Sequence, residues 1–235
     1  MNARGRASRS HELVRFANRR AAGRRLGEAV SQLRLAPPVL VLGLPRGGVP
    51  VAYEVAQAVD APLDVLTVRK IGMPGQPELA IGAIATGDVV VQEPGAASFL
   101  PSLEPPFTQL AAAERRELRR REGLYRHGLP PLDLAGRNVV LVDDGIATGS
   151  TMLAAIRAAR KCQAASVIVG APVATPEAAR RISAEADRMV ILETPEILFA
   201  VGEWYDRFEQ LEDIEVCGLL LKAAHRHPFK PPDSR

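Results

Sequence analysis

Two adjacent carboxylates, Asp143 and Asp144, directly follow an apolar run of the sequence. The run, residues 138–142, holds four consecutive aliphatic residues, three of them valine, which is typical of a strand buried on both faces of a parallel sheet. Small and hydroxyl-bearing residues fill the loop 145–151, and a helix is expected from residue 152. A helix N-terminus attracts phosphate, whereas neighbouring carboxylates repel it unless the ligand also carries hydroxyls or a metal. The pattern therefore predicts a ribose phosphate site.

A second candidate anion site follows the apolar run 39–44. Gly47 and Gly48 would let backbone N–H groups approach an anion, and Arg46 adds a forked positive charge. Ligands of open α/β sheets bind at the carboxyl ends of the strands, so this loop is expected at the same sheet edge as the carboxylates.

Two further basic residues, Arg69 and Lys70, end the apolar run 63–68. Alternate residues of a strand point to opposite faces, so only one of the two can face a ligand at the sheet edge. We favour Lys70 for that position, and a solvated surface charge is the alternative reading.

The stretch 140–151 resembles the signature loop of the type I phosphoribosyltransferases. That family binds 5-phosphoribosyl 1-pyrophosphate (PRPP) and moves its ribosyl phosphate to a nitrogen nucleophile. The resemblance implies that Asp143 and Asp144 meet the ribose 2′- and 3′-hydroxyls. Two positions depart from the family pattern: Asp143, where many members carry Glu, and Gly145, where many carry an aliphatic residue. The backbone and hydroxyls that would hold the 5′-phosphate belong to Ala147, Thr148, Gly149, Ser150 and Thr151.

Residues 44–48 are similar to the pyrophosphate loop of the same family, which allows for a cis peptide bond there. The resemblance implies that Arg46, Gly47, Gly48 and Lys70 bind pyrophosphate. It also implies Mg²⁺ as cofactor, bound mainly by PRPP oxygens, with Asp143 and Asp144 acting through hydroxyls or water. The catalytic candidates are Arg46, Lys70, Asp143 and Asp144.

Two aromatic residues near the C-terminus, Trp204 and Tyr205, are candidates for stacking on a base. In purine-type members of the family an aromatic residue near this point stacks on the base, a contact that contributes about 1–3 kcal/mol. Packing in the core is an equal alternative for both residues.

The element pattern predicts a doubly wound α/β fold, with a mostly parallel sheet flanked by helices and an inserted hood. Strands are expected at 39–44, 63–68, 138–142, 166–170 and 189–192, and a hairpin at 80–85 and 89–92. Helices are expected at 12–33, 51–59, 114–125, 152–156 and 176–186, the fourth being a helix start. The chain divides into a disordered basic arm (1–11), a core (12–70 and 137–220), the hood (71–136) and a polar tail (221–235).

The charge is uneven along the 235 residues, although the formal net charge is only +3. Residues 1–34 hold nine Arg against two Glu. A basic arm could meet nucleic acid or acidic lipid, but we favour a solvated arm and do not expect nucleic acid as a partner. No apolar run approaches the about 20 residues that a membrane span needs, and no secretory signal is recognisable. Cys162 and Cys217 show no metal or redox spacing, so buried free thiols in a cytoplasmic protein are expected.

Three functions fit these observations. The first is a phosphoribosyltransferase that acts on a nucleobase or similar heterocycle, with PRPP and the base as its small-molecule partners. The second is a PRPP- or nucleotide-sensing regulator on the same fold, which could also bind nucleic acid. The third is another sugar-phosphate enzyme, such as a phosphoribosyl hydrolase. Arg46 and Lys70 together favour catalysis, since a sensor has no leaving group to stabilise. The identity of the base and a homodimeric state stay open.

Overall fold

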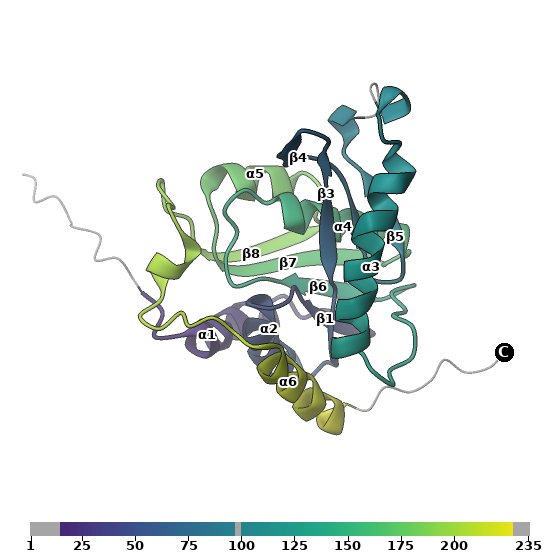
Figure 1. The fold of residues 1–235 in the computed structure, drawn as a ribbon. Coiled ribbons are helices and arrows are strands. Elements are labelled where there is room, and N and C mark those ends of the chain that lie inside the picture. Colours follow the sequence, from purple (N-terminus) through teal and green to yellow (C-terminus); the bar gives the residue numbers. More distant parts are fainter. Residues whose placement is uncertain (1–14, 97–99, 228–235) are drawn as a thin grey trace, which may run out of the picture.

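A five-stranded parallel sheet forms the centre of the protein (Figure 1). The computed structural model describes residues 15–96 and 100–227, so the predicted arm 1–11 lies outside the described residues. The strands, in spatial order, are β2 (Leu63–Val65), β1 (Val39–Gly43), β6 (Asn138–Val142), β7 (Ser166–Val173) and β8 (Arg188–Glu193). The order reverses between β1 and β6, which pair from Val39 with Asn138 to Gly43 with Val142. This confirms the doubly wound prediction and puts the switch point between the two predicted anion loops.

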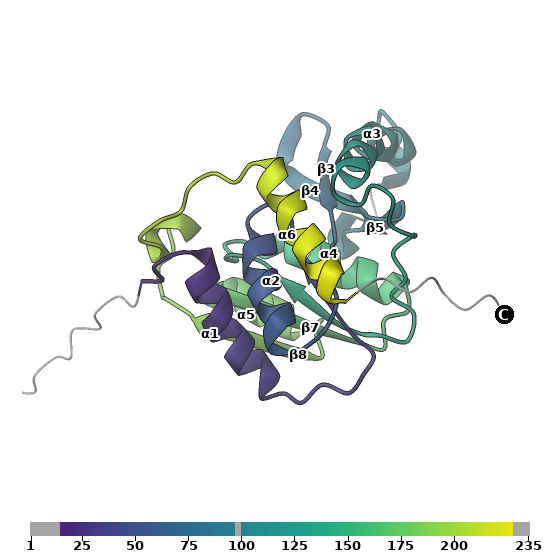
Figure 2. The same cartoon turned by 90° about the horizontal axis from the view of Figure 1, so that it is seen from below.

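Helices cover both faces of the sheet, as Figures 1 and 2 show. One face carries α1 (Arg19–Ser31), α2 (Gly48–Ala58) and α6 (Asp213–Arg226), and the other carries α4 (Ser150–Lys161) and α5 (Pro176–Ser183). Strand alternation divides the core between these layers, because Val139 and Leu141 pack with α4 while Val140 and Val142 pack with α2. All four side chains are fully buried, and each such burial contributes about 1.5–3 kcal/mol.

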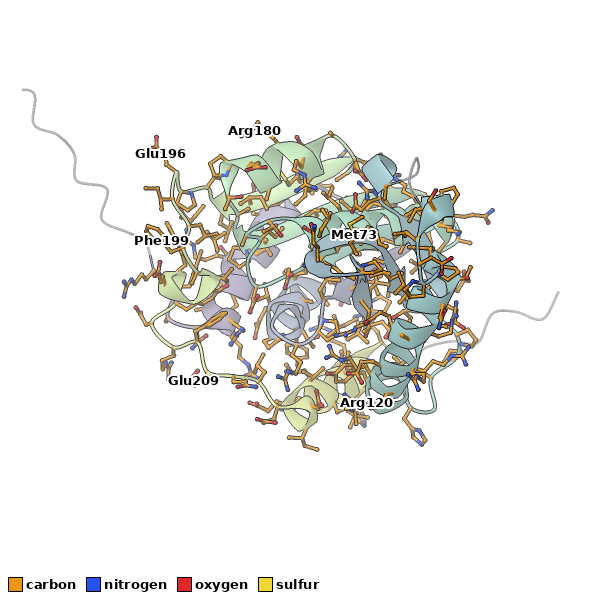
Figure 3. All side chains as sticks on the ribbon, turned by 45° about the horizontal axis from the view of Figure 1, so that its top comes forward. Met73, Arg120, Arg180, Glu196, Phe199 and Glu209 are labelled. Atoms are coloured by element: carbon orange, nitrogen blue, oxygen red, sulfur yellow. The ribbon has the colours of Figure 1, made fainter. Side chains whose placement is uncertain are left out.

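A smaller antiparallel sheet rises beside this core. It consists of β3 (Val68–Met73), β4 (Gln76–Ala85) and β5 (Val89–Gln92), so the predicted hairpin is confirmed. Helix α3 (Phe107–Tyr125) packs on one side of it, after the short 3₁₀ turns η1 (Pro94–Ala96) and η2 (Leu100–Ser102). Figure 3 labels Met73 at the end of β3 and Arg120 on α3.

The predicted strand 63–68 is wrong at its C-terminal end. Strand β2 stops at Val65, and β3 starts at Val68 in the other sheet, so Arg69 and Lys70 do not end a core strand. Paired hydrogen bonds cause the change of sheet: the N–H of Thr67 donates to the hydroxyl of Thr86, and the N–H of Thr86 donates to the carbonyl of Thr67. The hood therefore begins before the predicted residue 71.

The two ends of the described chain also differ from expectation. Helix α1 begins at Arg19, not residue 12, because the side chain of Asn18 caps it by accepting the N–H of Ala21. The predicted tail 221–235 is wrong in its first part, since α6 continues to Arg226. A capping box formed by Glu212 and Glu215 starts this helix. The thiols of Cys162 and Cys217 are free but only half-buried.

A buried ion pair ties α3 to the core. Asp64 on β2 has no exposed surface, and its carboxylate accepts two-pronged hydrogen bonds from Arg126 at 2.9–3.2 Å. Arg126 therefore does not form the i,i+4 pair with Glu122 that helical spacing suggests, although Glu117 and Arg121 do pair. None of the described helices combines the length and the apolar composition that a membrane span requires.

Candidate active site at the switch point

The loops after β1 and β6 lie against each other at the sheet edge. The Pro45–Arg46 peptide bond is cis, and the next residues pack directly under the carboxylate loop. A Cβ atom on Gly47 would collide with the carboxylate of Asp144, and one on Gly48 would lie 2.5 Å from the carbonyl oxygen of Val142. The paired glycines are therefore required by the close approach of the two loops.

Asp144 is bound by a residue that the sequence analysis did not select. The Nε of Arg19 donates to its carboxylate at 2.7 Å, and the two side chains are 11% and 13% exposed. Arg19 also donates from Nη1 to the carbonyl of Glu209 at 2.9 Å and lies 3.6 Å above the ring of Phe208. In the sequence, Arg19 is only one of the nine arginines of residues 1–34, so nothing there sets it apart.

Asp143, half-buried like its neighbour, contacts the loop backbone. Its Oδ1 accepts the backbone N–H of Asp144 at 2.9 Å. Burial, followed by the negative charge of Asp144, raises the pKa of Asp143 well above its usual range. The site thus combines Asp144, a carboxylate paired with a cation, and Asp143, a carboxyl group with a raised pKa.

The loop after the carboxylates is tied to α5 by its carbonyl groups. The carbonyl of Ala147 accepts the hydroxyl of Thr175 at 2.7 Å, and that of Thr148 accepts Nη1 of Arg181 at 3.0 Å. At the loop's first residue, Gly145, a Cβ atom would collide with Val201, so the close packing of this valine leaves no room for a side chain here.

The backbone N–H groups of this loop form a candidate phosphate cradle. Within the described ranges, nothing accepts a hydrogen bond from the N–H groups of 147, 148, 149 and 151. Gly149 adopts a left-handed conformation, with φ of 76°, directly before α4 begins at Ser150. The hydroxyl oxygens of Thr148 and Ser150 lie 3.1 Å apart, and Thr148 is exposed. N–H groups at a helix start that lack internal acceptors are suited to a phosphate.

A cavity of about 400 Å³, here called the edge cavity, opens beside these loops. It brings together three predicted residues, Arg46, Gly47 and Asp144, and adds Arg19 and the segment 208–211. Figure 3 labels Glu209 on this segment, which runs along the surface between the 3₁₀ turn η3 (Val201–Trp204) and α6.

Lys70 does not line the edge cavity. It is exposed on β3, whereas its neighbour Arg69 is held by Glu114 of α3 at 2.8 Å. Strand alternation puts Lys70 on the same face as Val68, which packs with Ala154 of α4. Of the two basic residues, Lys70 is therefore on the side of β3 that faces away from α3, toward α4.

The aromatic candidates are packed in the core. Trp204 and Tyr205 are 8% and 4% exposed, and the ring of Tyr205 stacks on Phe208 with centroids 4.9 Å apart. The hydroxyl of Tyr205 donates to the carbonyl of Asp144 at 2.5 Å, and burial raises its pKa. Both rings are covered in this conformation, which favours the core-packing alternative, while base stacking by this pair stays a prediction. Phe208, which the sequence analysis missed, is the aromatic residue at the edge cavity.

The carboxylates do not form a metal site by themselves. In the part of the chain that the structure describes, no group of three or more His, Cys, Asp or Glu side chains could hold a metal ion. With Asp144 engaged by Arg19, the donor set fits only a Mg²⁺ that arrives on ligand oxygens and keeps its waters.

Comparison with known proteins assigns the family. The family model described as phosphoribosyl transferase domain matches residues 15–207. Two proteins of Mycobacterium tuberculosis (strains CDC 1551 and H37Rv), each named "Putative phosphoribosyl transferase", are 44% identical over 214 residues. That match covers 90% of this chain and 47% of each relative, so the chain spans about half their length.

A crystal structure of a Thermus thermophilus protein shows the same fold in a chain of similar extent. It superposes with a TM-score of 0.81 at 44% identity, over 88% of this chain and 98% of the other. The match to the family model covers both loops of the switch point and most of the chain. The chain therefore belongs to the phosphoribosyltransferase family.

Proposed function

We propose that the protein transfers the 5-phosphoribosyl group of PRPP to a nitrogen nucleophile, a nucleobase or similar heterocycle, and releases pyrophosphate. The main observation behind this proposal is that the N–H groups of residues 147, 148, 149 and 151, at the start of α4, have no acceptor within the described chain. On one side of this cradle lie the carboxylates 143 and 144, and the glycine loop 46–48 packs against them. These three parts match the phosphate, hydroxyls and pyrophosphate of one ligand.

The reaction breaks the anomeric C–O bond to pyrophosphate and forms a C–N bond, so positive charge develops on the ribose ring. The 147–151 cradle would fix the 5′-phosphate, while Asp143 and Asp144 would orient the ring hydroxyls and stabilise that charge. Arg46 and Lys70 would neutralise the departing pyrophosphate. Mg²⁺, when bound to PRPP, supplies further charge neutralisation on the pyrophosphate oxygens.

The antiparallel sheet with α3 would serve as the cover that excludes water. PRPP is hydrolysed if water reaches the anomeric carbon, so a transferase must shield it. Lys70 lies on this sheet, and closure toward the cradle would bring its ammonium to the leaving group. The function of Lys70 is therefore expected to depend on closure, in contrast to Arg46, which already lines the edge cavity.

The proposal is tested by incubating the protein with PRPP, Mg²⁺ and a panel of purine and pyrimidine bases, and measuring pyrophosphate release. Base-dependent release is expected, with kcat/KM reduced about 100-fold or more in Arg46→Gln, since a charged contact to the leaving group is lost. Arg116→Gln, which changes an exposed arginine on α3, is the matched control.

The other outcomes separate the remaining readings. Equal pyrophosphate release without any base would favour a phosphoribosyl hydrolase. PRPP binding without turnover on any base would favour a sensing role. Absence of both PRPP binding and turnover would refute the proposed site.

A further inference from the structure

A second and larger cavity, here called the helix cavity, lies next to the edge cavity on the face of the sheet that carries α1, α2 and α6. Its volume is about 490 Å³, within the range of pockets that hold small organic ligands. It lies between the start of α1 and the middle of α6, with Pro50 of α2 among its lining residues. The two cavities share Arg19 and the segment 209–211 as a common wall.

Three basic side chains face the helix cavity without a counter-ion. Arg20 comes from α1, Arg207 from the segment before α6, and Lys222 from α6 itself. Among the described residues, none of the three forms an ion pair or a side-chain hydrogen bond, and all are exposed. All three line the same cavity from separate segments, so an anion bound in it would be attracted by their combined charge.

The lining of the helix cavity carries an excess of positive charge that comes from three separate segments. Besides Arg19, whose charge is already paired with Asp144, three basic residues stand against two acidic ones, Glu209 and Glu215, which leaves a formal charge of +1. Glu215 is engaged in the capping box, where its carboxylate accepts the N–H of Glu212 at 2.9 Å. A phosphate monoester carries a charge of about −1.5 to −2 at pH 7 and three strong acceptor oxygens, so it can bind basic groups from more than one of these segments.

The cavity also has an apolar part that an inorganic ion would not use. Pro50, Leu211 and Leu219 contribute aliphatic surface next to the basic residues. A ligand with a phosphate group and an uncharged organic body would cover both kinds of surface. From the cavity, its charge and this surface, we propose that the helix cavity binds a small organic phosphate of nucleotide size. The proposal does not require that the protein transfers phosphoribosyl groups.

Through the shared wall, a ligand in the helix cavity would affect the edge cavity. Arg19 holds Asp144 through Nε and the carbonyl of Glu209 through Nη1. A ligand that draws Arg19 or the segment 209–211 toward the helix cavity would weaken these contacts. Any effect on PRPP affinity must then be matched by an equal effect of PRPP on the affinity of this ligand.

The test is isothermal titration calorimetry on the full chain with AMP and GMP as probes, and with orthophosphate and adenosine as partial probes. Wild type is expected to bind the nucleotides more tightly than either partial probe. Arg20→Gln/Lys222→Gln is expected to weaken nucleotide binding in this cavity at least about tenfold, since two charged contacts are removed. Arg116→Gln/Arg180→Gln removes the same charge from exposed helix positions elsewhere and should bind as wild type does.

A variant of the edge cavity, Arg46→Gln/Ser150→Ala, distinguishes the two cavities, and circular dichroism confirms that each variant is folded. The proposal requires that this variant keeps the binding event that Arg20→Gln/Lys222→Gln loses. It is overturned if wild type binds neither nucleotide, if adenosine binds as tightly as AMP, or if the helix-cavity variant binds as wild type does. Equal weakening in the Arg116/Arg180 control would also overturn it, because the effect would then be general charge attraction.

Discussion

Replacing Arg19 by Gln tests whether the buried ion pair organises the site. The substitution removes the charge that faces Asp144 at 2.7 Å and the guanidinium over Phe208. Gln keeps a helix-compatible side chain of similar polarity, so the first turn of α1 and its Asn18 cap should persist. What remains is a carboxylate that is 13% exposed, next to Asp143, with no cation in contact.

The expected cost follows from that burial. Removing one partner of a buried ion pair costs about 3–5 kcal/mol, because the other charge is left uncompensated. Residual exposure of both groups places the value near the lower limit, at about 3 kcal/mol. In a domain of 150–250 residues this corresponds to a Tm decrease of roughly 6–12 °C.

Guanidinium chloride unfolding at pH 7 and pH 5 measures this cost. The deficit of Arg19→Gln should be smaller at pH 5, because protonation of one carboxylate of the 143–144 pair relieves the repulsion. The double variant Arg19→Gln/Asp144→Asn should recover about 2 kcal/mol relative to the single variant, since no unpaired charge is left. The reasoning fails if Arg19→Gln unfolds within about 0.5 kcal/mol of wild type, or if the double variant is no more stable than the single one.

Three further outcomes are expected. The raised pKa of Asp143 means that its charged form opposes folding, so the free energy of unfolding should fall as pH rises from about 4 toward the folded-state pKa. The Asp143→Asn variant should lose this pH dependence in urea titrations between pH 4 and 8. It should also be more stable than wild type at pH 7. Gly145→Ala should lose about 1–3 kcal/mol in thermal unfolding through its collision with Val201, and adding Val201→Ala should restore most of it. Arg126→Gln should lose about 3–5 kcal/mol in denaturant unfolding, because it leaves Asp64 charged and fully buried.

Each outcome has a clear contrary result. A Gly145→Ala protein that Val201→Ala does not rescue would show that the contact with Val201 is not the cause. If Asp143→Asn were less stable than wild type at pH 7, the carboxylate would be favoured in the folded state. An Arg126→Gln loss that persists when Asp64→Asn is added would point to lost packing and not to an unpaired charge.

The sequence predicted those elements that restrict residue type locally. The aliphatic runs before Gly43 and Asp143 identified two adjacent core strands, and the turn around Gly87 identified the hairpin. These segments carry their own signal because buried parallel strands and tight turns restrict residue type directly.

What could not be predicted depends on contacts between distant residues. Arg19 and Asp144 are 125 positions apart, and the sequence around either residue does not indicate its partner. The run 63–68 predicts one strand, yet the N–H of Thr67 bonds to the hydroxyl of Thr86, 19 residues later. This contact places the backbone after Val65 next to another sheet. The covering of Trp204 and Tyr205 depends likewise on Phe16, whose N–H donates to the carbonyl of Trp204.

The link between the first described helix and the segment before the last one bears on how the protein is made. Arg19 binds the carbonyl of Glu209, 190 positions later, while Phe16 and Asp206 are joined through their backbones. At about 5–20 residues per second, the ribosome needs about 10–40 s to synthesise the intervening chain. During that interval the nascent chain can form the strand before Asp144 but cannot close the site around it. The candidate site is therefore expected to form last, after nearly the whole domain has left the ribosome.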